Sequence, residues 1–425
     1  MAPPLPAQGH ARPSRPAAIY ALVLLTLSYA LNFMDRYALA AMAEAIKADL
    51  KLTDTQVGLL IGFAFSLVYS VCGIPLALLA DRTSRKRVLA ASIAVWSLMT
   101  MLGARAGSFV ALAACRMGVG VGEAGGVPPA HALLADLFSP RSLPAAIGVY
   151  SSGSAVGLAL GLGLGAALAE TYGWRQALVI LGAPGLILAA VIWLTLREPA
   201  RTGLRRAQAA RRPFWPDLLG VARNAGLRRL SMAMSLAAVA GFGALAWLPA
   251  LLHRRFAGGA DGLDQALSQA IGAANLGGVL LGGVIAGFVA RRGGDSVRIV
   301  CSASVLAAAP LLWTACAAAT PGPFVAAAAA GVFFHSLILA PVMTGVQQLA
   351  GPESRALSSA SLLLVMNIVG LGGGPFLIGV LSDSLQDLGS AAALSIALGV
   401  AIASYLLAAA LFLAPAPNAH PQREA

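Results

Sequence analysis

Long apolar runs alternate with short polar segments along almost the whole chain of 425 residues. A helix needs about 20 apolar residues to cross the hydrocarbon core of a bilayer, and most of these runs reach that length. The pattern therefore predicts an all-α membrane protein with twelve transmembrane helices in two sets of six. The predicted spans are residues 17–40, 55–80, 87–104, 109–137, 143–169, 175–196, 229–252, 266–290, 297–319, 322–349, 356–381 and 389–414.

The same pattern divides the chain into two halves and three connecting or terminal segments. Residues 17–199 and 229–414 are the predicted six-helix halves, and residues 200–228 between them are a predicted linker. Residues 1–16 form a Pro-rich tail that we expect to be disordered, and residues 415–425 form a second tail. Because the number of spans is even, both tails and the linker are predicted on one side of the membrane.

Landmarks in the two halves recur at a constant offset of 212 or 213 residues, which indicates an internal duplication that makes the halves pseudo-symmetric. Paired six-helix repeats are typical of transporters. The alternative is that abundant Pro and Gly residues align by chance. The matching pairs are Pro129 and Pro341, Pro140 and Pro352, and Gly157 and Gly370.

Basic residues gather in the predicted loops 82–87, 197–229 and 291–298, all on the side of the termini. By the positive-inside rule this side is the cytoplasm, so we expect a multi-pass protein with both termini cytoplasmic. The net charge of +12 then reflects this bias and contact with anionic membrane lipids. No basic stripe alternates with stacking aromatic residues, so nucleic acid is not an expected partner. Absence of Asn-x-Ser/Thr sequons and the excess of Arg over Lys fit a bacterial inner membrane.

The chain offers no pattern for a bound metal or cofactor. Cys72, Cys115, Cys301 and Cys316 lie in apolar runs without ligand spacing, so neither a disulfide nor a metal site is predicted. No Walker pattern occurs, which disfavours ATP-driven transport, and no cofactor is expected. A membrane-embedded enzyme would need clustered histidines or paired carboxylates at an interface, and a channel would need repeated pore-lining polar residues.

Asp81 ends the second predicted span and is followed by Arg82, Arg85 and Lys86. A topology signal needs only positive charge, so the carboxylate favours a second role. We expect Asp81 to face the positive N-terminal dipole of span eleven and, with the three basic residues, to form a latch between the halves. A plain topology signal is the alternative.

This region resembles a known family. The segment Gly73–Arg87 is similar to motif A of the major facilitator superfamily, with Ala77 and Ser84 where glycines are usual. The resemblance implies alternating-access transport, and characterised eukaryotic relatives of one branch, the spinster type, carry sphingolipid or lysophospholipid cargo. We expect a monomer. Segments that resemble the spinster-type branch are Asn32–Tyr37, Gly118–Ala124 and Met366–Pro375.

Four charges lie inside predicted spans: Asp35 and Arg36 in span one, and Arg116 and Glu123 in span four. Unpaired ions in hydrocarbon cost several kcal/mol each, so pairing is expected. Arg116 and Glu123 are two turns apart, about 10 Å along one helix face, so each should pair with span one. We predict proton coupling at Asp35 and Glu123, with Asp35 the better proton carrier, and a charge network completed by Arg36 and Arg116. A static network of ion pairs is the alternative.

The duplication also predicts a central cargo cavity. Glu123 precedes Pro129 by six residues, and His335 precedes Pro341 by six, so the two side chains occupy equivalent places in the halves. Trp247 follows Asp35 of span one by the same offset of 212 residues, so these two side chains are also predicted at equivalent places. A hydrogen-bonded core histidine and an interfacial tryptophan are the alternatives for these two. The residues predicted to line the cavity are Glu123, His335, Trp247, Asn367 and Tyr150.

These features together predict a secondary active transporter rather than an enzyme. We expect it to work by alternating access, coupled to protons, on an amphipathic lipid-like substrate such as a lysolipid, or on a hydrophobic organic anion. A drug or small-metabolite antiporter of the same fold is the alternative.

Overall fold

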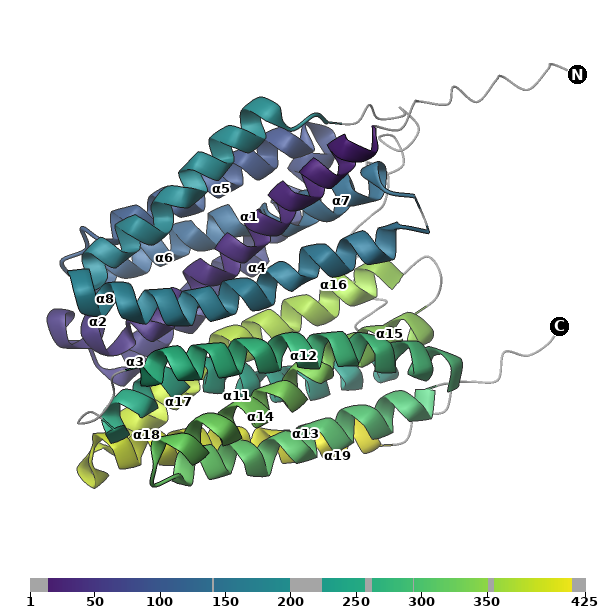
Figure 1. Ribbon diagram of the computed structural model, residues 1–425. Coiled ribbons are helices and arrows are strands. Elements are labelled where there is room, and N and C mark those ends of the chain that lie inside the picture. The colour runs from purple at the N-terminus through teal and green to yellow at the C-terminus, as the bar shows by residue number, and fades with distance from the viewer. Residues whose placement is uncertain are drawn as a thin grey trace, which may run out of the picture.

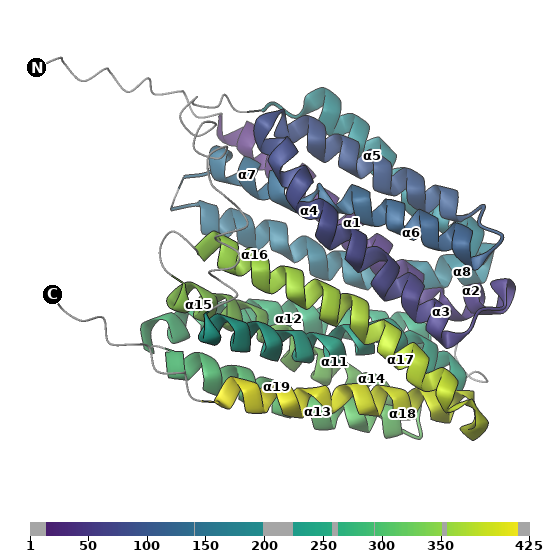
Figure 2. The same ribbon diagram turned by 180° about the vertical axis from the view of Figure 1, so that it is seen from behind.

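The computed structural model describes residues 14–139, 141–198, 224–256, 262–292, 294–350 and 355–414, which form a bundle of helices joined by short turns (Figures 1 and 2). The tail predicted at 415–425 and nearly all of the tail at 1–16 lie outside the described residues. Residue 199 and residues 200–223 of the predicted linker also lie outside the described residues, and the last residues of the predicted linker belong to the first helix of the second half.

The first half contains all helices up to Thr195. Short breaks divide several of its membrane-length helices, for example at Gly125 and Gly126 between α6 and α7. Its elements are α1 (Arg15–Ala41), α2 (Ala43–Leu50), α3 (Asp54–Gly58), a π-helical turn (Leu59–Phe63), α4 (Ala64–Arg82), α5 (Arg85–Gly103), α6 (Phe109–Ala124), α7 (Val127–Leu137) and α8 (Leu143–Thr195).

The second half repeats this plan, including a break before Leu339 that corresponds to the break before Val127. Its elements are α11 (Ala225–Phe256), α12 (Leu263–Arg292), α13 (Gly294–Ala317), α14 (Pro321–Leu337), α15 (Leu339–Leu349), α16 (Arg355–Met366), a π-helical turn (Asn367–Gly372), α17 (Gly373–Ser384), a 3-10 turn (Gln386–Leu388), α18 (Ser390–Ile402) and α19 (Ser404–Leu413).

Ten of the described helical segments are long and apolar enough to cross a membrane. One of them, α8, reverses direction at Gly173, whose φ of 79° suits glycine, so it contributes the two predicted spans 143–169 and 175–196. The predicted span 87–104 corresponds to α5, a helix of 19 residues that opens on three basic residues and is not among the ten. The twelve predicted spans thus all correspond to helices.

Four glycines spaced four residues apart in α8 form a stripe that packs closely on α1, as expected for membrane helices: Gly153, Gly157, Gly161 and Gly165. A Cβ atom on Gly157 would lie 2.2 Å from the carbonyl oxygen of Ala30 in α1. In the second half, a Cβ on Gly370 would lie 2.3 Å from Cβ of Ala238 in α11. The two glycines of the predicted repeat therefore make the same kind of contact, each against the first long helix of its half.

The two halves meet most closely at the end of the bundle that carries α2, α3, α17 and α18, and the starts of α1 and of α11 lie at the other end (Figures 1 and 2). We call the first the lock end and the second the termini end. At the lock end α3 packs on α17, and the two π-helical turns contact each other across the halves. Such turns often mark functional positions in membrane and soluble helices.

Replacing Gly58 with alanine tests whether this approach of the halves is needed. A Cβ on Gly58 would lie 2.4 Å from the backbone oxygen of Pro375, which has no freedom to move aside. Overpacking costs about 1–3 kcal/mol, so we expect transport into proteoliposomes to fall by about tenfold. Gly283→Ala is the matched control, since nothing lies within 4 Å of that Cβ position. Wild-type transport by the Gly58 variant would contradict this account.

Candidate functional site

An ion pair between Arg36 of α1 and Glu123 of α6 lies at the centre of the first half. Arg36 Nε donates to Glu123 Oε2 at 2.6 Å, and the Glu123 side chain is fully buried. The other carboxylate oxygen, Oε1, is buried with no hydrogen-bond partner among the described residues. A buried carboxylate with one unsatisfied oxygen is costly, and a proton or a polar ligand would remove that cost.

Aromatic rings surround the Arg36 guanidinium. Its carbon lies 4.7 Å from the ring centres of both Phe65 and Tyr69 in α4, and 5.2 Å from that of Phe33. Cation–π contacts of this kind stabilise the positive charge where water is scarce. The Arg36 side chain is nevertheless 13% exposed, so it stays within reach of a ligand that enters between the helices.

A second ion pair joins Asp35 to Arg116 at 3.2 Å, and Thr100 of α5 donates to the same carboxylate at 2.7 Å. As predicted, each charge of span four pairs with one of span one. Asp35 faces a small space beside Trp96 and Gly182, inside the first half. Both of its oxygens are satisfied, whereas one oxygen of Glu123 is not. Asp35 as the better proton carrier stays a prediction.

Tyr150 extends the aromatic surface from the ion pair toward the termini end. Its ring stacks on Tyr29 of α1 at 4.5 Å and meets the edge of His131 of α7 at 5.3 Å. Tyr29 is partly exposed and His131 is exposed, whereas Tyr150 is buried. The predicted cavity residues Tyr150 and Glu123 are therefore both buried and belong to one cluster of aromatic and charged side chains in the first half.

The remaining cavity candidates belong to the second half. His335 is buried against Gly241 of α11, with Phe242 and Tyr405 each 6.0 Å away, and its Nδ1 has no partner among the described residues. Trp247 is completely buried and donates from Nε1 to the backbone oxygen of Pro375 at 2.9 Å. The described contacts of both side chains are thus with helices of their own half.

Asn367 is partly exposed and begins the π-helical turn that contacts the first half. Among the described contacts, none joins His335 or Trp247 to Glu123. A central cavity lined by these side chains from both halves therefore stays a prediction.

A polar cluster at the lock end was not predicted from the sequence. We call it the lock, and its residues are Glu44, Lys47, Asp54, Arg254, Ser382 and Asp383. Arg254 of α11 donates to Glu44 of α2 at 2.7 Å and to both oxygens of Asp54 at 2.6 and 2.8 Å. Lys47 also binds Asp54, at 2.5 Å. Arg254 and Asp54 are 5% and 1% exposed, so the bridge between the halves is buried.

Two residues of α17 complete the lock. Ser382 donates to Asp54 at 2.6 Å, and the carboxylate of Asp383 accepts from the backbone N–H groups of Asp54 and Thr55. A carboxylate from one half thus caps the first turn of a helix in the other, where the dipole favours negative charge. The sequence signal for the lock was that acidic and basic residues lie next to the ends of predicted spans on the side of the membrane opposite the termini.

The predicted latch residues lie at the termini end. Asp81 pairs with Arg85 at 3.1 Å, and Arg85 also pairs with Asp136 of α7. Ser84 and the backbone N–H of Arg85 bind Glu198, which follows α8. These contacts lie within the first half, and residues 351–354, before span eleven, lie outside the described residues. A latch across the halves stays a prediction.

Comparison with known proteins agrees with this architecture. The sequence profile of the Major Facilitator Superfamily matches residues 25–373. An MFS-type efflux pump of Mycolicibacterium smegmatis is 34% identical over 410 residues, covering 95% of this chain and 93% of the pump. Protein spinster homolog 1 of Mus musculus is 29% identical over 395 residues, covering 86% of this chain and 73% of the mouse protein.

Solved structures give the same result. The crystal structure of a bacterial homolog of the human lysosomal transporter spinster, inward-facing and unoccupied, matches with a TM-score of 0.81 and 26% identity. The match covers 94% of this chain and 97% of that one. An inward-facing, occupied structure of such a homolog matches equally well, with 27% identity.

Proposed function

This chain belongs to the major facilitator superfamily, and from that premise we propose that it is a proton-coupled transporter that works by alternating access. Membership makes it a multi-pass membrane transporter rather than an enzyme. The proposal for coupling depends on one observation, the buried pair of Arg36 and Glu123 with its unsatisfied carboxylate oxygen.

The pair links proton binding to substrate binding in a simple way. While Glu123 is ionised, it neutralises Arg36 and competes with any anionic ligand for the guanidinium. A proton on Glu123 removes that competition, so an anionic group entering between the helices can bind Arg36 instead. The proton and the anion therefore favour each other, which is the requirement for coupled movement.

The partly exposed rings of Tyr29, Phe33 and Tyr69 next to this cation, with the buried Tyr150 stacked behind Tyr29, fit a cargo with an apolar body and an anionic group. We therefore propose an amphipathic lipid-like substrate or a hydrophobic organic anion. The similarity to spinster proteins supports the first of these. The 34% identity to an efflux pump favours a second candidate, a drug or small-metabolite antiporter with the same proton site.

Transport by the purified wild-type protein tests the proposal. Proteoliposomes would be loaded with candidate lysophospholipids or, in parallel, with cationic drugs, and release would be followed with and without a pH gradient. We expect release to depend on the gradient and to be blocked by excess unlabelled cargo. Release that is saturable but unaffected by any pH gradient would refute proton coupling, and release of only cationic drugs would favour the second candidate.

We also propose that the termini face the cytoplasm of a bacterial cell and that the lock end faces outward. A cysteine at Thr83, at the termini end, should then be shielded from an impermeant thiol reagent in intact cells, because the positive-inside rule places its basic loop inside. A cysteine at Gly107, in a turn at the lock end, should be labelled. The reverse labelling pattern would overturn the orientation.

A further inference from the structure

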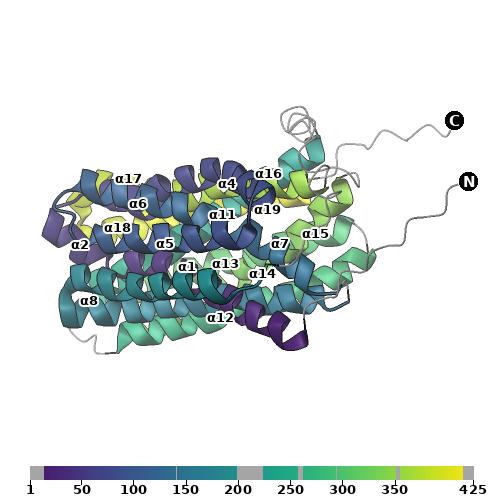
Figure 3. The same cartoon turned by 90° about the horizontal axis from the view of Figure 1, so that it is seen from above.

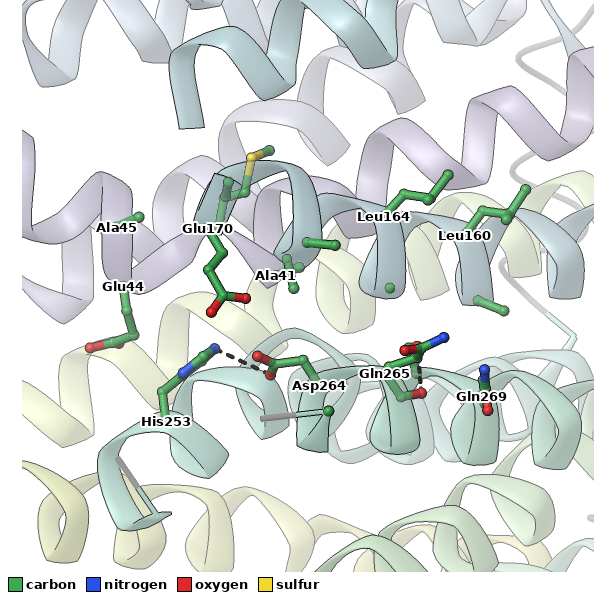
Figure 4. A pocket seen from close by; sticks show the side chains of 18 of the residues that line it. Ala41, Glu44, Ala45, Leu160, Leu164, Glu170, His253, Asp264, Gln265 and Gln269 are labelled. Carbon is green, nitrogen blue, oxygen red and sulfur yellow. Dashed lines mark hydrogen bonds and ion pairs between the residues drawn. The ribbon is translucent and has the colours of Figure 1, made fainter. Parts of the chain in front are cut away.

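A cavity of about 1170 Å³ lies beside the lock, between α8 and α12 (Figure 4). Pockets for small molecules usually measure about 300–1,000 Å³, so this one is large enough for a ligand. The two helices run side by side along the bundle, one from each half (Figures 1 and 3). The end of α11 and the start of α2 close the cavity toward the lock. It is separate from the pair of Arg36 and Glu123.

The two walls of the cavity differ in polarity. The α8 wall carries only small or aliphatic side chains until Glu170, and the α12 wall carries a carboxylate, two amides and a hydroxyl. Leu160 and Leu164 are at least 40% exposed, so the cavity can be reached from the surface. The α8 lining is Ala159, Leu160, Gly163, Leu164, Ala166, Ala167, Ala169 and Glu170, and the α12 lining is Asp264, Gln265, Ser268 and Gln269.

The cavity also has a polar and an apolar end. Its apolar end lies where the helices touch: a Cβ on Gly272 would lie 2.5 Å from Cβ of Ala159. From Ala159 to Glu170 the α8 helix rises about 16 Å. Glu170 and Asp264 stand at the polar end, next to the lock. A ligand with a polar head and an alkyl chain matches this gradient along the α8 wall, and Gln265 and Gln269 of α12 lie opposite that wall (Figure 4).

The charged side chains around the cavity determine which polar head group a ligand can have. His253 binds Asp264 at 3.2 Å, and Arg254 is held by two carboxylates of the lock. Glu170 has no hydrogen bond or ion pair among the described residues, and its carboxylate points across the cavity toward the His253–Asp264 pair (Figure 4). Gln265 and Gln269 point from α12 toward α8 in the same view.

Carboxylates outnumber permanent cations around the cavity and the lock, although the whole chain has a net charge of +12. A cationic head is therefore favoured over an anionic one, both on approach and when bound. The carboxylates are Glu44, Asp54, Glu170, Asp264 and Asp383, and the cations are Lys47 and Arg254.

We propose that this cavity binds an amphiphile with a quaternary or primary ammonium head and one alkyl chain. The head lies between Glu170 and the side chains of Asp264 and Gln265, and the chain lies along the α8 wall toward Leu160. The site is additional to the proposed cargo path, so its test measures binding and does not depend on transport.

The test uses radiolabelled decyltrimethylammonium and the full-length protein in nanodiscs, with empty nanodiscs to subtract partitioning. We expect saturable binding, and competition by unlabelled decyltrimethylammonium but not by decanesulfonate. Glu170→Gln removes the free carboxylate and should weaken binding about fivefold. Ala167→Phe fills the apolar wall and should weaken it at least as much. Asp387→Asn removes an exposed carboxylate at the same end, outside the cavity, and should bind like the wild type.

Three results would overturn the proposal. The first is binding no greater than to empty nanodiscs, and the second is equal competition by decanesulfonate. The third is wild-type affinity in both the Glu170 and the Ala167 variants, which would place any bound amphiphile elsewhere. Retained transport or an unchanged melting temperature in each variant would show that weaker binding does not come from misfolding.

Discussion

Glutamine in place of Glu123 is expected to abolish net transport driven by a pH gradient while leaving exchange of cargo across the membrane intact. Glutamine keeps the shape of the side chain but cannot take up or release a proton, so the protein would remain in its protonated-like state. Coupling free energies of about 1–3 kcal/mol correspond to changes of roughly 5- to 150-fold. We therefore expect net uptake in proteoliposomes to fall by about 100-fold.

Asp35→Asn is the matched comparison, because it removes the other carboxylate of the same network. Thr100 and Arg116 satisfy both oxygens of Asp35 inside the first half, so we expect this variant to keep its dependence on the pH gradient even if its stability falls. The opposite outcome, loss of pH dependence in Asp35→Asn and its retention in Glu123→Gln, would return the proton role to Asp35.

Replacing Arg254 with methionine is expected to open the lock end. Removing one partner of a buried ion pair costs about 3–5 kcal/mol, and here the buried carboxylate of Asp54 loses its bidentate partner and keeps Lys47, while the partly exposed Glu44 stays beside it. This energy shifts an equilibrium between two conformations by about 100-fold or more. Paired spin labels on cysteines at Arg105 and Leu388, exposed positions of the two halves at this end, should report a longer distance.

Arg175→Met provides the control for the lock. Arg175 also pairs with a carboxylate at the lock end, that of Asp49, but both lie in the first half and both are more than 40% exposed. Exposed pairs contribute about 1 kcal/mol or less, so this variant should leave the distance unchanged. An unchanged distance in Arg254→Met as well would mean that helix packing alone keeps the halves together at this end.

The sequence alone was enough to predict the membrane helices, because the length and apolarity of a span are local requirements of the bilayer. It also predicted that the charges of span four pair with those of span one. An isolated charge in hydrocarbon is so costly that two acidic and two basic side chains inside the spans are expected to form ion pairs. The correspondence of Gly157 with Gly370 was visible for a similar reason, since close helix contact needs a small residue at a fixed position.

Rotation of each helix about its axis was decided by tertiary packing. Neighbouring residues of a helix point about 100° apart, so a match in level along the bundle does not say which neighbour a side chain meets. This is why Asp35 lies against Thr100 while the next residue, Arg36, meets Glu123. It is also why His335 and Trp247 pack within their own half although the repeat predicts them at a central cavity.

The lock and the cavity beside it likewise depend on the fold. In the sequence Asp54 lies 200 residues from Arg254 and 329 residues from Asp383, and all three lie at helix ends, where no periodic pattern restricts them. Only the approach of α11 and α17 to α3 brings these charges together, and burial there makes each of them depend on its partners. The length of each apolar run thus determined where the helices are, whereas contacts between helix ends distant in sequence determined at which end of the bundle the two halves are joined.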